Sequence, residues 1–182
     1  DVERSRGLGD VYKRQVVKYG MIKSDELFGI LMNHDINTVH EVMDDIIARC
    51  VAIKRDVVEA DEFDKGERML LNFGHTLGHS IEQYYHYTGI SHGRAVAKGM
   101  EIITDLAEKR GMCRKGLTAD LCGCLKKYEL TRDIGPTPAQ LGSACMNDKK
   151  RDGSSIHVII CSDIGKSSAV KMSVADFNDF LA

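Results

Sequence analysis

Apolar residues recur at intervals of three and four along most of this chain, which is the spacing of one face of an α-helix. Its only prolines are Pro136 and Pro138, so few positions forbid a helix. Ser173 can cap a last helix, and Gly111 follows two basic residues as a C-terminal stop should. The pattern predicts a mainly α fold, with helices over 12–20, 25–33, 37–60, 67–87, 93–110, 117–128, 137–147 and 173–181.

One stretch near the C-terminus departs from the helical period. In "SSIHVIICSDIGKSSAVKMS" the apolar residues Ile156, Val158 and Ile160 alternate with their neighbours, as in a half-buried strand. A Ser-Asp-Ile-Gly turn follows, and residues 169–172 can return as the partner strand. We expect one small β-hairpin beside the helical body.

Length and charge restrict the class of protein. A chain of 182 residues suits one compact domain with a sizeable core. With 25 basic against 27 acidic side chains and no basic face, a nucleic-acid partner is not expected. Six cysteines without a CxxC pair read as reduced thiols. No apolar run reaches the roughly 18 residues that span a bilayer. We therefore expect a cytoplasmic protein with no membrane partner.

The first fifteen residues, "DVERSRGLGDVYKRQ", differ in composition from the rest. They are rich in glycine and arginine and show no apolar period before Val16. We interpret residues 1–15 as a non-native segment, translated from adapter or vector DNA, with a frayed native terminus as the alternative. Residues 16–182 are then one helical metal- and substrate-binding domain.

Three histidines occupy a segment otherwise suited to helices, "NFGHTLGHSIEQYYHYTGISHGRAVAKGM". His75 and His79 are four residues apart, so on a helix they share one face. Glycine precedes each of them, at about 1 kcal/mol of helix propensity per glycine, which suggests close backbone packing or ligand approach. The turn before His92 can fold the next helix back, bringing His92 to the same place. Together they form a candidate metal or catalytic site.

Residues before the histidines add basic and amide groups. Arg68, Asn72, His75 and His79 follow steps of four, three and four, which places all four on one stripe if the helix is continuous. Lys54 lies upstream in "KRDVVEADEFDKGE". N–H donors of this kind suit the oxyanions of a phosphorylated or carboxylated small molecule. We expect such a substrate.

From Lys18 onward the chain resembles the C-terminal domain of the 3-dehydroquinate synthase family. Four segments carry the resemblance, in the family's order: "VVKYGMIKSDELF", "KRDVVEADEFDKGERMLLNFGHTLGHSIE", "SHGRAVAKGM" and "NDKKRDGSSIHVIICSDIG". The resemblance implies a multi-helical metal- and substrate-binding domain whose N-terminal NAD-binding partner domain is absent here. It also implies a homodimer in the complete enzyme.

The resemblance assigns roles residue by residue. His75 and His92 match zinc ligands, while His79 matches a substrate contact despite its spacing from His75. The remaining matches are to positions that bind the substrate's phosphate, carboxylate and hydroxyls: Lys18, Lys54, Arg68, Asn72 and one lysine of the pair Lys149 and Lys150, for which we take Lys150.

The reaction that the resemblance implies is conversion of 3-deoxy-D-arabino-heptulosonate 7-phosphate to 3-dehydroquinate and phosphate, a lyase step of the shikimate pathway and aromatic amino acid biosynthesis. Its cofactors are Zn²⁺ or Co²⁺, with NAD bound mainly by the missing domain. The metal polarises a hydroxyl and the basic side chains hold anionic oxygens.

The chain departs from the family's pattern in three respects. No strand–GxGxxG–helix unit is present, so we expect this chain alone to be inactive. Gln15 stands where the family has its third metal ligand, a glutamate, and Arg94 replaces another glutamate. Two alternatives stay open: another NAD- and zinc-dependent sugar-phosphate cyclase, such as a deoxy-scyllo-inosose or valiolone synthase, and a non-catalytic helical metal-binding module. The iron-dependent alcohol dehydrogenases lack "RMLLNFGHTLGH".

Overall fold

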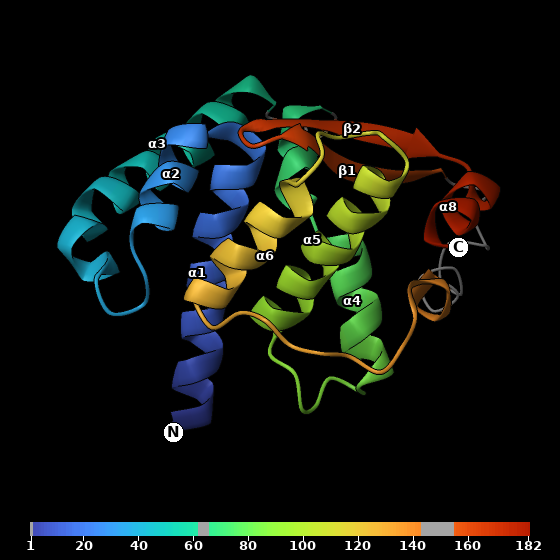
Figure 1. Ribbon diagram of the computed structural model, residues 1–182, viewed down its shortest axis with the longest axis horizontal. Helices are drawn as coiled ribbons and strands as arrows, with labels where there is room; N and C mark the ends of the chain where they lie inside the picture. Colours follow the sequence, from blue (N-terminus) through green and yellow to red (C-terminus); the bar gives the residue numbers. More distant parts are fainter. Residues whose placement is uncertain (1, 62–65, 143–154) are drawn as a thin grey trace.

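The computed structural model describes residues 2–61, 66–142 and 155–182 of the chain. A layer of helices lies beneath one antiparallel hairpin, which crosses the bundle at one end (Figure 1). This confirms the mainly α class with one small hairpin. The elements in chain order are α1 Val2–Lys23, α2 Asp25–Asn33, η1 Val39–Val42, α3 Met43–Ala60, η2 Glu67–Asn72, α4 His75–Tyr84, α5 His92–Lys109, α6 Leu117–Lys127, β1 Ile156–Asp163, β2 Lys166–Met172 and α8 Val174–Leu181.

Serine caps explain several helix starts. The Ser24 side chain accepts a hydrogen bond from the Leu27 backbone N–H at the start of α2, and Ser91 does the same for Arg94 at the start of α5. Ser173 and Asp176 form a reciprocal capping box at the start of α8. Each serine satisfies a backbone donor that the first helical turn leaves without a partner. The predicted starts of these helices agree with the structure to within one residue.

The predicted single helix over 67–87 is wrong. A 3₁₀ helix, η2, ends at Asn72, and α4 begins separately at His75. Between them Gly74 has a φ of +79°, a left-handed conformation that favours glycine and interrupts the helix. A Cβ at Gly74 would also overlap Met100 and the Val96 carbonyl. Arg68 and Asn72 are therefore not on one continuous stripe with the histidines.

Other boundaries differ from the prediction by less. Helix α1 extends N-terminally to Val2 instead of beginning near residue 12. The predicted helix over 37–60 is divided into η1 and α3. Of the predicted helix over 137–147, residues 138–142 are helical and the remainder lies outside the described residues. The hairpin forms as predicted and is longer, pairing Ile156 with Met172.

Helices α4 and α5 approach each other closely because glycines face one another across the interface. A Cβ on Gly78 would lie 2.8 Å from Val96 Cγ2, and one on Gly99 would overlap the Gly74 carbonyl oxygen. The glycines near His75 and His79 were expected to mark close backbone packing or ligand approach, and they mark the former. This contact fixes the position of α5, and so of His92, against the histidines of α4.

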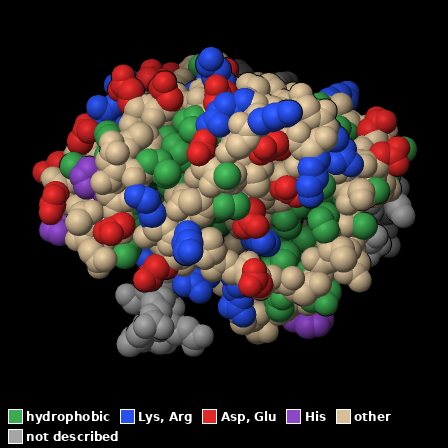
Figure 2. Space-filling model, in the orientation of Figure 1, with side chains coloured by type: hydrophobic (Ala, Val, Ile, Leu, Met, Phe, Trp, Pro, Cys, Tyr) green, Lys and Arg blue, Asp and Glu red, His purple; other side chains and the backbone are tan. Residues whose placement is uncertain are grey.

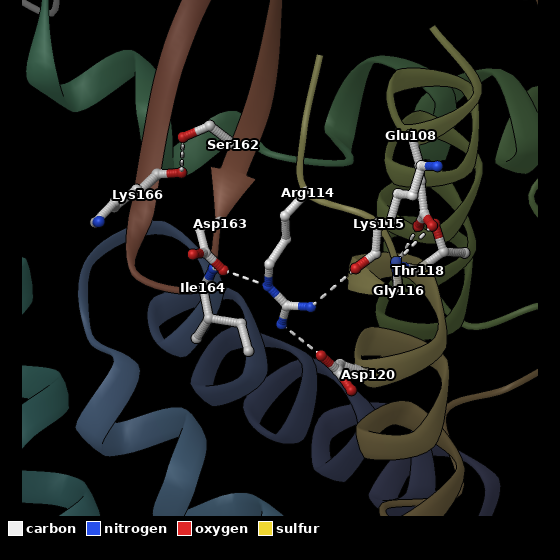
Figure 3. A network of polar contacts seen from close by, with 10 residues as sticks. All are labelled: Glu108, Arg114, Lys115, Gly116, Thr118, Asp120, Ser162, Asp163, Ile164 and Lys166. Atoms are coloured by element: carbon white, nitrogen blue, oxygen red, sulfur yellow. Dashed lines mark hydrogen bonds and ion pairs between the residues drawn. The ribbon is translucent and has the colours of Figure 1, made fainter. Parts of the chain in front are cut away.

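Arg114 joins the loop after α5 to the hairpin and to α6 (Figure 3). Its Nε donates to Asp163 Oδ1 at 2.5 Å at the end of β1, and its Nη2 donates to Asp120 on α6. Glu108 accepts from the backbone N–H groups of Gly116 and Thr118 at the start of α6. These bonds fix the end of the bundle that lies under the hairpin.

The core is one continuous apolar cluster shared by the helices and the inner face of the hairpin, and it includes Phe73, Met100 and Phe177. On the face seen in Figure 2, basic and acidic side chains are interspersed. None of the helices in the described parts of the chain is both long enough and apolar enough to span a membrane.

Candidate metal and anion site

The three histidines predicted to meet do lie together. His75 is the first residue of α4, His79 lies one turn further along it, and His92 is the first residue of α5. The ring centroids are 5.6 Å apart for His75 and His92, 5.9 Å for His75 and His79, and 6.1 Å for His79 and His92. The site thus forms where α5 folds back on α4.

Burial keeps one of these imidazoles neutral. Burial, together with the nearby positive charges of Lys18 and Arg14, lowers the pKa of His75 to about 3. The ring is therefore uncharged at neutral pH, with a lone pair free to bind a metal ion. Its Nδ1 lies 3.3 Å from the Phe73 carbonyl oxygen.

Two buried cations from α1 lie beside the histidines. Lys18 is 2% exposed, and its Nζ donates to the Leu71 carbonyl oxygen at 2.6 Å. Burial, together with the positive charges of Arg14 and Lys54, lowers the Lys18 pKa to about 7. Arg14 is 3% exposed, and its Nε has no hydrogen-bond partner within the described structure. Desolvated donors of this kind favour an anionic ligand.

Gln15 makes bonds only to neighbours on α1 in the described structure. Its Nε2 donates to the Tyr19 hydroxyl at 2.7 Å, and its Oε1 accepts from Arg14 at 3.4 Å. An amide oxygen can bind a cation but brings no charge to it. Its role as third metal ligand stays a prediction.

Glu82 is an acidic residue at the site, and the sequence analysis did not single it out. It lies on α4 three residues after His79, and its carboxylate oxygens are 3.1 and 3.2 Å from His92 Nδ1. Ligand atoms of His79, Glu82 and His92 all lie within 4.8 Å of one another. Its position three residues after His79 was a signal in the sequence, because residues at that spacing share a helix face.

The other predicted site residues are more peripheral. Lys54 on α3 is exposed but close enough to influence Lys18 electrostatically. Arg68 and Asn72 of η2 are also exposed. Lys149 and Lys150 lie outside the described residues. The structure thus brings together His75, His79, His92 and Lys18, while the roles of all the predicted site residues stay predictions.

Helix α1 is held against the first turn of α5 by a small polar cluster. Ser91 Oγ donates to Asp10 Oδ2 at 2.8 Å, and Arg94 Nε forms an ion pair with the same oxygen at 3.1 Å. A Cβ on Gly93 would overlap the Asp10 backbone. Arg94 therefore contacts α1 rather than the histidine rings. The cluster places Asp10 of the compositionally distinct first segment next to His92.

Comparison with known proteins identifies the family to which the chain is similar. Residues 14–151 match the family described as 3-dehydroquinate synthase C-terminal. The 3-dehydroquinate synthase of Clostridium perfringens strain 13 is 43% identical over 173 residues, which is 94% of this chain and 48% of the relative. That of Streptococcus thermophilus LMD-9 is 39% identical, over 92% of this chain and 48% of the relative. The chain thus spans about half the length of these relatives.

Solved structures show the same fold. A 2-deoxy-scyllo-inosose synthase complexed with carbaglucose-6-phosphate, NAD⁺ and Co²⁺ matches with a TM-score of 0.75 at 20% identity, over 95% of this chain and 50% of that one. A 2-epi-5-epi-valiolone synthase from Streptomyces hygroscopicus, with NAD⁺ and Zn²⁺ bound, matches with a TM-score of 0.76 at 23% identity, over 92% and 48%. With the sequence match across most of the chain and this shared fold, the protein belongs to the 3-dehydroquinate synthase family, in the part described as C-terminal.

Proposed function

We propose that this chain is the metal- and substrate-binding half of an enzyme that converts 3-deoxy-D-arabino-heptulosonate 7-phosphate to 3-dehydroquinate and phosphate. The observation that carries the proposal is the meeting of three imidazoles with the buried cations Lys18 and Arg14. Such a site offers neutral nitrogen ligands to a metal and positive charge to a phosphate or carboxylate, both of which this substrate requires.

The metal would be held by His75 and His92, with the third family position occupied by Gln15. Neutral imidazoles suit Zn²⁺ and Co²⁺, and the two solved relatives hold those ions together with NAD⁺. When bound, the metal supplies a Lewis acid for a substrate hydroxyl and NAD supplies a hydride acceptor. In this chain Gln15 brings no negative charge, so we expect weak metal binding.

The anionic ends of the substrate would be held by the cations around α1. Lys18 has a pKa of about 7 because it is buried beside other cations, and a bound phosphate or carboxylate favours its charged form. Lys54, Arg68, Asn72 and His79 would add contacts from the exposed rim. We also propose Lys150 as a contact, from outside the described residues.

Activity would require the half of the enzyme that this chain does not match. No strand–glycine loop–helix unit for a dinucleotide occurs in the parts of the chain that the structure describes. We therefore expect no turnover from the chain alone. The complete enzyme would be a cytoplasmic homodimer with no nucleic-acid or membrane partner.

The test is a chimeric enzyme in which residues 14–182 follow the unmatched N-terminal half of the Clostridium perfringens relative. Phosphate release from the heptulosonate phosphate is measured with NAD and Zn²⁺, for the chimera and for its Gln15→Glu variant, with a hexose 6-phosphate as control substrate. We expect release from the heptulosonate phosphate, strongest with Gln15→Glu and lost with His92→Ala. A well-folded Gln15→Glu chimera that binds Zn²⁺ but releases no phosphate would contradict the proposal.

A further inference from the structure

Glu82 contacts a predicted metal ligand, although the family resemblance assigned Glu82 itself no role. Its side chain is 15% exposed, and both carboxylate oxygens lie at nearly equal distances, 3.1 and 3.2 Å, from the single atom His92 Nδ1. The two residues come from different helices, the last turn of α4 and the first residue of α5. This contact therefore ties the two helices together at the site.

The chemistry of the acceptor decides which nitrogen of His92 carries the proton. An ionised carboxylate can only accept hydrogen bonds, so Nδ1 must donate and the lone pair of a neutral ring is left on Nε2. His75 shows the same arrangement, because its Nδ1 lies 3.3 Å from the Phe73 carbonyl oxygen, which also only accepts. Both predicted ligands thus have Nδ1 bonded to oxygen, and within the described residues no hydrogen bond reaches Nε2 of either ring.

We propose that Glu82 is a positioning residue that fixes the tautomer and orientation of His92, so that its Nε2 faces the metal. The metal part of this inference rests on the proposed function. Ligating histidines in proteins usually donate their other ring N–H to a carboxylate or a carbonyl, which raises ligand basicity and holds the ring in place. Glu82 and the Phe73 carbonyl supply these two kinds of acceptor.

The competing assignment makes Glu82 itself a ligand with His79 and His92, since their ligand atoms lie within 4.8 Å. Two observations favour the positioning role. Both carboxylate oxygens are directed at one ring nitrogen, as in a shared N–H donation, and Glu82 also interacts electrostatically with the buried Arg14 on α1. A carboxylate that accepts from an imidazole N–H and is attracted by a guanidinium is already partly compensated without a metal ion.

The first test reads the tautomer without any metal. Two-bond ¹H–¹⁵N correlation spectra of the metal-free, ¹⁵N-labelled chain near neutral pH show which ring nitrogen of His92 is protonated, with His92→Ala identifying its signals. We expect the proton on Nδ1 in the unmodified chain and on Nε2, the form that a neutral imidazole prefers without a partner, in Glu82→Ala. Gln83→Ala, an exposed neighbour on the same helix, is the matched control and should leave the tautomer unchanged. An Nε2-protonated His92 in the unmodified chain, or no change in Glu82→Ala, would overturn the inference.

The second test titrates Co²⁺ alone and follows its visible absorption. We expect Glu82→Ala and the shape-conserving Glu82→Gln to weaken binding by about tenfold to a hundredfold with an unchanged band shape, and His75→Ala or His92→Ala to abolish it. Loss of binding in Glu82→Ala together with full binding in His75→Ala would make Glu82 a ligand and overturn its positioning role. No Co²⁺ binding by the unmodified chain would instead count against the proposed metal site, and the tautomer spectra would still decide the contact between Glu82 and His92.

Discussion

Burial of Lys18 should make the stability of this domain rise with pH. Burial, Arg14 and Lys54 lower its pKa from 10.5 to about 7. Between these two values the unfolded chain binds a proton at Lys18 that the folded chain does not, so folding becomes more favourable as pH rises. The penalty is fully present below about pH 7 and disappears as pH approaches 10.5. Replacing Lys18 with methionine removes this dependence.

The magnitude follows from the two pKa values. A drop of about 3.5 in pKa corresponds to about 5 kcal/mol of unfavourable free energy when Lys18 is fully protonated. Between about pH 7 and about pH 9, Lys18 alone should raise the free energy of unfolding by about 2 kcal/mol. Cysteine thiols of the unfolded chain also titrate near the upper end of this range, while burial raises their pKa in the folded chain, but this contribution is shared by the chain and its variant. The difference between the two therefore isolates Lys18.

The assay is urea unfolding followed by circular dichroism at several pH values, for the chain, for Lys18→Met and for Lys23→Met. Lys23 is the matched control because it lies on the same helix, is exposed and pairs with Glu67. We expect the slope of stability against pH to fall in Lys18→Met only. Equal slopes in the chain and in Lys18→Met would show that Lys18 is not held in a desolvated site.

Three further predictions concern packing, capping and substrate binding. Gly99→Ala should reduce the free energy of unfolding by about 1–3 kcal/mol, because the new Cβ would overlap the Gly74 carbonyl oxygen. The control is Gly123→Ala, whose Cβ would meet, among the described residues, only Met32 at 4.0 Å and should leave the free energy of unfolding unchanged or raise it by up to about 1 kcal/mol. Equal effects of the two substitutions in urea unfolding would refute the close packing of α4 and α5. Hydrogen bonds from Thr118 and Gly116 lower the Glu108 pKa from 4.5 to about 2, so the stability that this carboxylate contributes is lost as pH falls through that range. Glu108→Gln should therefore have a lower melting temperature than the unmodified chain near neutral pH and should lose less stability on acidification. Identical thermal melts of the two proteins across this pH range would contradict this prediction. Arg68→Leu in the chimeric enzyme should reduce kcat/KM about a hundredfold, which corresponds to a loss of about 3 kcal/mol in transition-state stabilisation, while the fold stays near native. Unchanged kinetics would remove Arg68 from the site.

Much of the fold follows from local signals in the sequence. Helix α2 occupies the predicted residues 25–33 because Ser24 caps it and its apolar residues share one face. The hairpin was predicted from the spacing of Ile156, Val158 and Ile160, all buried on β1, and from a turn in which Gly165 has a φ of +75°. These features depend on residues close in sequence, so a period and a cap are enough to predict them.

The break between η2 and α4 could not be read from periodicity. The apolar period continues through residues 67–84, but Gly74 adopts a left-handed conformation because α5 packs against it, with Met100 and Val96 in the space that a side chain would need. That packing comes from residues more than twenty positions later in the chain. Glycine before His75 indicated a close contact without indicating which helix makes it.

The candidate site was partly predictable. Glycine spacing and the turn before His92 brought the three imidazoles together correctly, and the family resemblance added Lys18, whose burial is visible only in the structure. The burial of Arg14 depends on how α1 lies against α5 and had no sequence signal. Glu82 had one, its spacing from His79, but its contact with His92 also required the fold.

The central claim, that this domain carries the metal site of its family, is tested most directly by calorimetric titration of Zn²⁺ into three proteins. These are the chain, Gln15→Glu, and Gln15→Glu combined with His92→Ala. An anionic oxygen at position 15 offsets the dication's charge where the amide does not, so Gln15→Glu should bind Zn²⁺ about tenfold more tightly or better. Adding His92→Ala should remove that gain. Equal Zn²⁺ affinities in all three proteins would contradict the assignment of the metal to His75, His92 and position 15.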